Sequence, residues 1–190
     1  MIITELKNLW RTPLEGNKPV SLEMKITYKN GETATVRYKS ALITERYGSN
    51  PNQLFTLLLP EDYNFGLVEV KTGKGGFSAT NIEDSFWAAE LLKYFDRTAC
   101  VVMKHVNPSG AALNDDISKA FLKAWWTDWI AAYGSVVGFN RPITRDLAEM
   151  LVEKGPDGVN AKYFIEVVAA PGFEEGAIGT LERRKDLRVL

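Results

Sequence analysis

The sequence predicts an α/β domain with a largely parallel or mixed sheet, preceded by an N-terminal β-hairpin. In the C-terminal two thirds, short β-branched segments alternate with amphipathic stretches of helical length, a pattern typical of layered α/β folds. Near the N-terminus, apolar and polar residues alternate on both sides of an Asn-Gly pair, as they do in hairpins. We therefore expect a hairpin extension over residues 1–44 and an α/β lobe over residues 45–190.

The hairpin is predicted for residues 22–39, LEMKITYKNGETATVRYK. Asn30 and Gly31 tolerate positive φ, so a type I′ turn is expected between the two strands. The loop ERYGSNPNQ follows, and LFTLLLP after it is either a short strand or one helical turn. LVEVK then reads as a strand, whereas the glycines of TGKGG predict an irregular connection.

In the lobe, helices and strands are predicted to alternate from about residue 82 onward. A helix over residues 82–95 is capped by Thr80 or Asn81, and the strand ACVVMK ends at an Asn-Pro-Ser-Gly turn. The remaining predicted elements are a helix over 115–130, a strand over 133–140, a helix that Thr144 caps and Gly155 ends, a strand in FIEVVAAPG, a helix in EEGAIGTLERR and a strand in LRVL.

Composition argues against several classes of protein. The formal net charge is -1, so no basic field attracts nucleic acid. No apolar run approaches the ~20 residues that span a bilayer. The chain has 1 Cys and 1 His, too few for a zinc cage of thiolates and imidazoles, and little cysteine suits a reducing compartment. We expect a cytoplasmic protein without metal, membrane or nucleic acid partners.

His105 is the only histidine, and it follows Lys104 at the end of the predicted ACVVMK strand. Imidazole titrates near neutral pH, and a neighbouring cation favours its neutral, proton-accepting form. A base beside a cation that stabilises an oxyanion suits acyl or formyl transfer to a weak amine nucleophile. The alternative is a surface histidine next to a solvated lysine, because a match of two residues is weak evidence.

Other side chains offer weaker signals. In ERYGSNPNQ, Arg46 can grip a phosphate and Tyr47 can donate a hydroxyl or stack on a ring, although a plain loop is the alternative. Core or interface packing is favoured for the tryptophans at 125, 126 and 129. Cys100 is expected to be a small core residue. Loops beyond strand ends carry chemistry in α/β sheets, and Lys104-His105, Tyr133-Gly134 and Ala170-Pro171-Gly172 are expected in such loops.

Six separated segments together point to one family: RYGSNPNQ, FSATNIEDSFWAAELLKYF, ACVVMKHVNPSGAA, DWIAAYGSVVGFNRPI, FIEVVAAPGFEEGAI and RRKDLRVL. In this order and spacing they resemble the AICAR transformylase part of the bifunctional purine enzyme, over residues 45–190. The resemblance implies formyl transfer from 10-formyltetrahydrofolate to the 5-amino group of AICAR in purine biosynthesis. It also implies a three-layer, cytidine deaminase-like lobe.

The resemblance also implies roles for individual residues. His105 matches the proton acceptor, and Lys104 matches the residue that stabilises the transition state. Arg46 and Tyr47 match the pair that holds the phosphate end of the nucleotide. Further matched positions near the substrate are Asn81, Gly134 and Glu166. Departures from the family pattern fall at Asn52, Ala79, Thr80, Trp129 and Ala131.

Transformylases of this family contain two similar lobes, and the chain resembles the first. The second lobe supplies much of the folate site, and the active sites resemble clefts shared between subunits of a dimer. We therefore expect this chain to supply the nucleotide-facing half-site and the general base. A homodimer or a complementary second lobe would complete the site, the chain being a truncated piece or a natural half. The alternative is a non-catalytic nucleotide-binding or dimerisation module.

Overall fold

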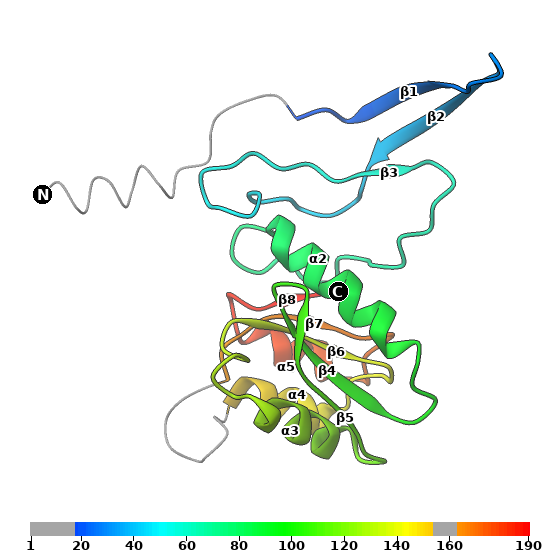
Figure 1. Cartoon of the computed structure of the whole chain (residues 1–190). Coiled ribbons are helices and arrows are strands. Elements are labelled where there is room, and N and C mark those ends of the chain that lie inside the picture. Colours follow the sequence, from blue (N-terminus) through cyan, green and yellow to red (C-terminus); the bar gives the residue numbers. More distant parts are fainter. Residues whose placement is uncertain (1–17, 154–162) are drawn as a thin grey trace, which may run out of the picture. The chain divides into compact units, whose positions relative to one another are not determined.

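A computed structural model describes residues 18–153 and 163–190 (Figure 1). These residues form two compact units, the first from residues 18–68 and 76–79 and the second from residues 69–75, 80–153 and 163–190. Within the described residues, no helix combines the length and the apolar character needed to cross a bilayer. The helix end predicted at Gly155 lies outside the described residues.

The first unit contains a three-stranded antiparallel sheet in the order β1-β2-β3. β1 (Ser21–Thr27) and β2 (Thr33–Ser40) form the predicted hairpin. The segment LFTLLLP contains a short strand, β3 (Leu58–Pro60), and not a helical turn. Because side chains alternate across a strand, the register gathers apolar pairs on one face of the hairpin. Those pairs are Leu22 with Tyr38, Met24 with Val36 and Ile26 with Ala34.

The hairpin turn differs from the predicted type I′ turn. Gly31 has a φ of 84°, and its amide donates to the carbonyl of Tyr28 at 3.0 Å. Asn30 does not share the positive φ, because among the described non-glycine residues only His105 and Val106 have one. The connection is therefore a type I turn followed by a left-handed glycine, which is the usual three-residue hairpin loop.

The second unit is built on a mixed five-stranded sheet in the order β5-β4-β6-β7-β8. β4 runs antiparallel to both β5 and β6, whereas β6, β7 and β8 are parallel. This arrangement confirms the predicted α/β class with a mixed sheet. The strands are β4 (Ala99–Lys104), β5 (Asn107–Leu113), β6 (Ser135–Phe139), β7 (Ile165–Ala169) and β8 (Arg188–Val189).

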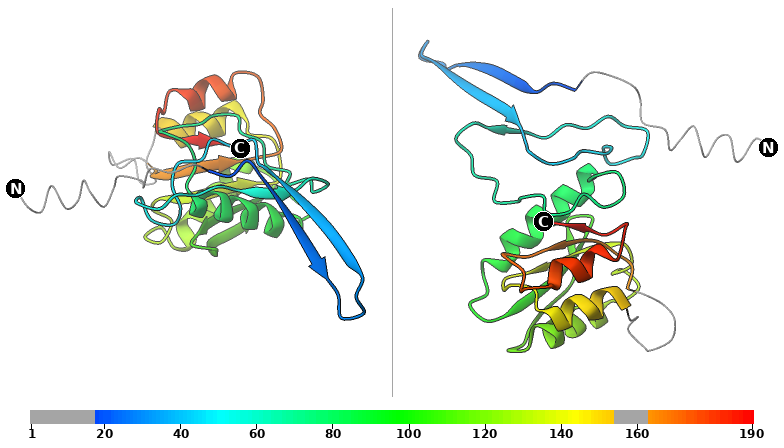
Figure 2. Two further views of the ribbon diagram at one scale, coloured as in Figure 1. Left: turned by 90° about the horizontal axis from the view of Figure 1, so that it is seen from above. Right: turned by 180° about the vertical axis from the view of Figure 1, so that it is seen from behind.

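Helices cover both faces of this sheet. The helices are α2 (Ala79–Leu92), α3 (Ile117–Thr127), α4 (Arg145–Glu153) and α5 (Ala177–Glu182). Figure 1 shows α2 on one face and α3, α4 and α5 on the other. α2 approaches β6 closely, because a Cβ added to Gly138 would lie 3.1 Å from the Cβ of Ala88. On the other face, the right-hand view of Figure 2 shows α4 beside α5, and Arg183 pairs with Glu149 at 2.8 Å.

The main core lies between the sheet and the α3–α5 layer. It contains Cys100 of β4 together with Phe121, Trp125 and Tyr163. The ring of Trp125 is edge-on to Tyr163 with centroids 5.0 Å apart, a geometry that aromatic pairs prefer. The predicted core roles of Cys100 and Trp125 are confirmed, whereas Trp126 and Trp129 are exposed.

Three further local predictions are wrong. LVEVK is not a strand: only Lys71 makes a bridge, to Val189, and Val68 is 71% exposed, so no buried face holds the segment in a sheet. The helix begins at Ala79, so Thr80 and Asn81 lie inside its first turn and do not precede it.

The third wrong prediction is the turn at Asn107-Pro108-Ser109-Gly110, which instead forms the first half of β5. Proline is tolerated there because β5 is an edge strand. Gly110 serves packing: a Cβ at this position would lie 1.9 Å from the carbonyl oxygen of Ala124 on α3. The turn lies two residues earlier, at His105 and Val106.

Candidate functional site

The turn that joins β4 to β5 consists of His105 and Val106. Lys104 pairs with Asn107, so only these two residues lie between the strands. Their φ angles are 53° and 62°, and positive φ at both central positions is the mark of a type I′ turn. Left-handed backbone costs an L-residue about 1–2 kcal/mol, and a β-branched residue such as valine is a genuine outlier there.

A buried carboxylate from α2 holds this turn. Asp84 is 6% exposed, and its two oxygens accept from the amide of His105 at 3.1 Å and the amide of Val106 at 2.6 Å. Hydrogen bonds to a charged group contribute about 1.5–3 kcal/mol, which offsets much of the conformational cost. The sequence prediction missed Asp84. The available signal was its position one helical turn after Asn81, which places both residues on one face of α2.

The structure brings Lys104 and Gly134 together. Because β4 and β6 are antiparallel, Lys104 at the end of β4 lies beside the start of β6. Its ammonium donates to the carbonyl of Tyr133. Gly134 has a φ of 77°, and a Cβ there would lie 3.3 Å from Phe164 and 3.8 Å from the Lys104 Nζ.

Asn81 and Glu166 form a second contact at this end of the sheet. The Asn81 side-chain amide donates to the Glu166 carboxylate at 2.8 Å, and Asn81 is 5% exposed. Glu166 lies near the start of β7, next to the start of β6, because Ser135 pairs with Ile165. A carboxylate can accept several hydrogen bonds, so Asn81 orients Glu166 without using its full acceptor capacity.

A pocket of about 480 Å³ lies beside the turn. Lys104 is half-buried and His105 is exposed at this pocket. Its lining residues are Lys104, His105, Asn107, Pro108, Ser109, Asp128 and Ala131. Asp128 was not predicted; its carboxylate accepts from the amide of Ala131 at 3.0 Å. A lysine, a histidine and an aspartate therefore line the same pocket.

Arg46 and Tyr47 belong to the first unit and are described within it. The Arg46 guanidinium lies 4.8 Å from the centroid of the Tyr47 ring, within cation–π range. The Arg46 amide donates to the carbonyl of Phe77 at 2.7 Å, and the Tyr47 carbonyl accepts from Ala79 at 2.9 Å. These backbone bonds fix the loop locally; the phosphate-binding role of the pair stays a prediction.

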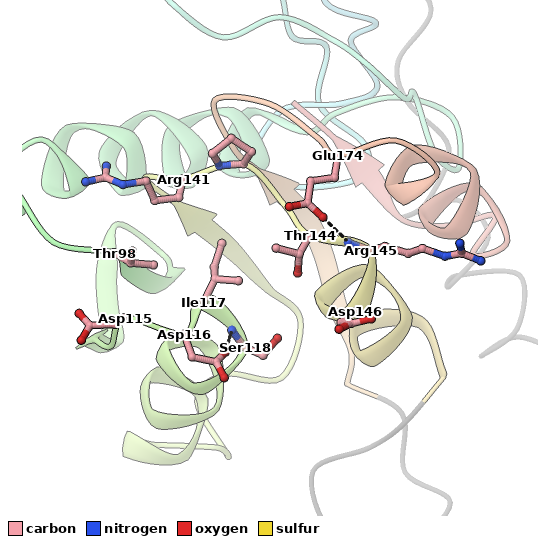
Figure 3. A pocket seen from close by; sticks show the side chains of 11 residues that line it. Thr98, Asp115, Asp116, Ile117, Ser118, Arg141, Thr144, Arg145, Asp146 and Glu174 are labelled. Atoms are coloured by element: carbon pink, nitrogen blue, oxygen red, sulfur yellow. Dashed lines mark hydrogen bonds between the residues drawn. The ribbon is translucent and has the colours of Figure 1, made fainter.

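The segment Ala170-Pro171-Gly172 lies at the opposite end of the sheet from Lys104. It follows β7, whereas Gly134 precedes the parallel strand β6. A separate pocket of about 600 Å³ lies at that opposite end (Figure 3). Ala170-Pro171-Gly172 therefore lies in a loop beyond a strand end, as expected, but at the opposite end of the sheet from Lys104 and Gly134, because residues before and after parallel strands lie at opposite ends.

The N-termini of α3 and α4 line this second pocket, and side chains already satisfy their amides (Figure 3). Asp116 accepts from the amides of Ser118 and Lys119. The predicted cap at Thr144 is confirmed, because its hydroxyl accepts from the amide of Leu147 at 3.2 Å. Glu174 accepts from the amide of Arg145 at 3.3 Å. The capping carboxylates leave little donor capacity for an anion.

Comparison with known proteins identifies the family. The family model described as "AICARFT/IMPCHase bienzyme" matches residues 17–190. The chain belongs to this family. Relatives with the name "Bifunctional purine biosynthesis protein PurH" include the protein of Caldicellulosiruptor saccharolyticus, which is 41% identical over 150 residues, and that of Thermoanaerobacter sp., which is 38% identical over 146 residues. The Clostridium botulinum protein is 35% identical over 162 residues.

The match covers most of the chain and a smaller part of each relative. It covers 76% of the chain for the first two relatives and 84% for the third. The aligned region is 27% of the first two relatives and 30% of the third. Family membership confirms the resemblance drawn from the six sequence segments.

Proposed function

We propose that this chain supplies the nucleotide-facing half-site and the general base for formyl transfer from 10-formyltetrahydrofolate to the 5-amino group of AICAR. A second α/β lobe, or a second subunit, would supply the folate-facing half. Family membership supports the reaction class. The observation that carries the proposal is that Lys104 and His105 line one pocket of about 480 Å³.

In the proposed reaction, the 5-amino nitrogen attacks the formyl carbon and a new C–N bond forms. His105 accepts the proton that this nitrogen loses, and the Lys104 ammonium stabilises the negative charge on the formyl oxygen. The bond from the formyl carbon to N10 of the folate then breaks. The proton held by His105 passes to N10, so the transfer is balanced and the imidazole returns to its neutral form.

The neighbouring groups suit recognition of a ribonucleotide. Glu166, oriented by Asn81 at 2.8 Å, is placed to accept from hydroxyl or amino donors of a ligand. Gly134 leaves room beside the Lys104 ammonium, since a Cβ there would lie 3.8 Å from the Nζ. Arg46 is the proposed phosphate contact, because a guanidinium can bind two phosphate oxygens at once.

Calorimetric titration of the purified chain with AICAR, with and without a folate analogue, tests the proposal. We expect saturable binding of the nucleotide by the chain alone. In a protein reconstituted with a second lobe, His105→Ala should abolish formyl transfer while nucleotide affinity stays within a few-fold, because a general base acts mainly in the transition state. Lys123→Ala, at an exposed position of α3, is the control for the companion change Lys104→Ala.

The two candidate functions give different results. A chain that binds AICAR and, with a second lobe, transfers no formyl group fits the non-catalytic nucleotide-binding module. A chain that binds no AICAR contradicts the proposed function. Loss of nucleotide binding in His105→Ala with unchanged turnover would contradict the role of His105 as the base.

A further inference from the structure

The proposed reaction gives no role to Asp84, a charged residue next to the proposed site. It lies on α2, on the opposite face of the sheet from α3, α4 and α5, and it is 6% exposed (Figure 1). Burying a carboxylate is costly unless hydrogen bonds compensate for the lost water. The bonds it receives come from the amides of His105 and Val106. The buried Asp84 carboxylate therefore binds the backbone of a two-residue turn.

The backbone of the turn is in a costly conformation. His105 and Val106 have φ angles of 53° and 62°, a region that glycine enters without penalty and that valine rarely enters. Without the carboxylate, both amides would lose their acceptor and the backbone would gain by returning to negative φ. That change would rotate the side chain of His105 relative to that of Lys104, because Lys104 is the last residue of β4 and His105 is the first residue of the turn.

We propose that Asp84 is the positioning residue of the Lys104–His105 pair. By accepting from both turn amides, it holds the left-handed turn at which Lys104 and His105 line one pocket. The role of this positioning in catalysis rests on the proposed function. The hydrogen bonds from the turn amides to Asp84 can be measured without a substrate. Asp84 touches backbone only, so it acts through His105 and takes no part in proton transfer.

The experiment uses the full chain with ¹⁵N backbone and ¹³C-labelled histidine. Because the chain contains 1 His, a single imidazole signal reports on His105 without assignment. Asp84→Asn keeps the shape and one acceptor oxygen but sets an NH₂ group against the other amide. Val106→Gly removes the cost of the left-handed backbone, alone and combined with Asp84→Asn. Asp62→Asn, at an exposed position, is the matched control.

We expect hydrogen exchange at the His105 amide to be about 10- to 150-fold faster in Asp84→Asn, the equivalent of one hydrogen bond to a charged group. The imidazole signal should broaden or split, and its shift on adding AICAR should become smaller than in the wild type. The double variant Asp84→Asn with Val106→Gly should recover most of the wild-type imidazole signal. Asp62→Asn should match the wild type.

An unchanged His105 amide and imidazole in Asp84→Asn would overturn the proposal. So would a double variant that regains stability but not the imidazole signal, because that result assigns Asp84 a purely structural role. If Asp84→Asn does not fold, the same signals are measured in Asp84→Glu. Its longer carboxylate should displace the turn and change the imidazole signal, and an unchanged signal would overturn the proposal. If the imidazole signal of the wild type does not shift on adding AICAR, only the proposed function is refuted. Amide exchange still tests whether Asp84 holds the turn.

Discussion

Replacing Gly134 by alanine tests whether the loop before β6 needs a left-handed residue without a side chain next to Phe164. The backbone there has a φ of 77°, which costs an alanine about 1–2 kcal/mol. The added Cβ would also lie 3.3 Å from Cε1 of Phe164. Phe164 stacks on Tyr133 with ring centroids 4.6 Å apart, so relieving the contact disturbs that stack at about 1 kcal/mol, the low end for overpacking.

The expected loss in the free energy of unfolding is therefore about 2–3 kcal/mol, as the sum of the backbone cost and the crowding. Gly176→Ala is the matched control, because its φ is 80° and nothing lies within 4 Å of its added Cβ. It should lose only the backbone part. Urea unfolding followed by the fluorescence of the 5 tryptophans, which include the buried Trp125, measures both losses. Each kcal/mol corresponds to about 2–4 °C in Tm for a chain of this size.

Equal losses for Gly134→Ala and Gly176→Ala would refute the crowding argument. A loss well below 1 kcal/mol for both would refute the assigned left-handed backbone. The Lys104 Nζ, at 3.8 Å from the added Cβ, is in ordinary van der Waals contact and should not be displaced. Gly134→Ala should therefore change the free energy of AICAR binding much less than it changes the free energy of unfolding.

Two further predictions follow from the described residues. Arg46→Ala should weaken AICAR binding by about 1.5–3 kcal/mol, or about 10- to 150-fold. Arg37→Ala is the control from the same unit. An unchanged affinity of Arg46→Ala for AICAR in calorimetry would show that Arg46 is not part of the site. Burial raises the pKa of the Cys100 thiol well above its ordinary 9.0, so the folded protein holds a proton that the unfolded chain loses as the pH rises through 9. The free energy of unfolding should therefore fall above pH 9 by up to about 1.4 kcal/mol per pH unit more than in Cys100→Ala, and parallel pH profiles of the two proteins would contradict this.

The sequence pattern could predict the hairpin from its alternation and the central strands from their apolar runs. The β1–β2 hairpin alternates cleanly, and β4, β6 and β7 are short apolar runs that the sheet buries on both faces. LVEVK has the same residue types but no covering layer, so the pattern alone misleads there. For β4, β6, β7 and LVEVK, tertiary burial, and not intrinsic propensity, decides whether a β-branched segment becomes a strand, whereas the hairpin forms with β1 largely exposed.

The turn after β4 could not be predicted from local sequence. Asn-Pro-Ser-Gly carries every ordinary turn signal, whereas His105 and Val106 carry none. The deciding group is Asp84, which is distant in sequence and reaches the turn only after α2 packs on the sheet. Likewise, the antiparallel pairing of β4 with β6 brings Lys104 to Gly134, and strand direction is not encoded in either segment alone.

The central claim is that AICAR binds against the imidazole and ammonium at the end of β4. Titration of the histidine-labelled chain with AICAR tests this most directly, because 1 His gives one imidazole signal. We predict a saturable shift of that signal, with the same dissociation constant as calorimetry and a midpoint about 10- to 150-fold higher in Arg46→Ala. Saturation of binding by calorimetry with an unmoved imidazole signal would contradict the account.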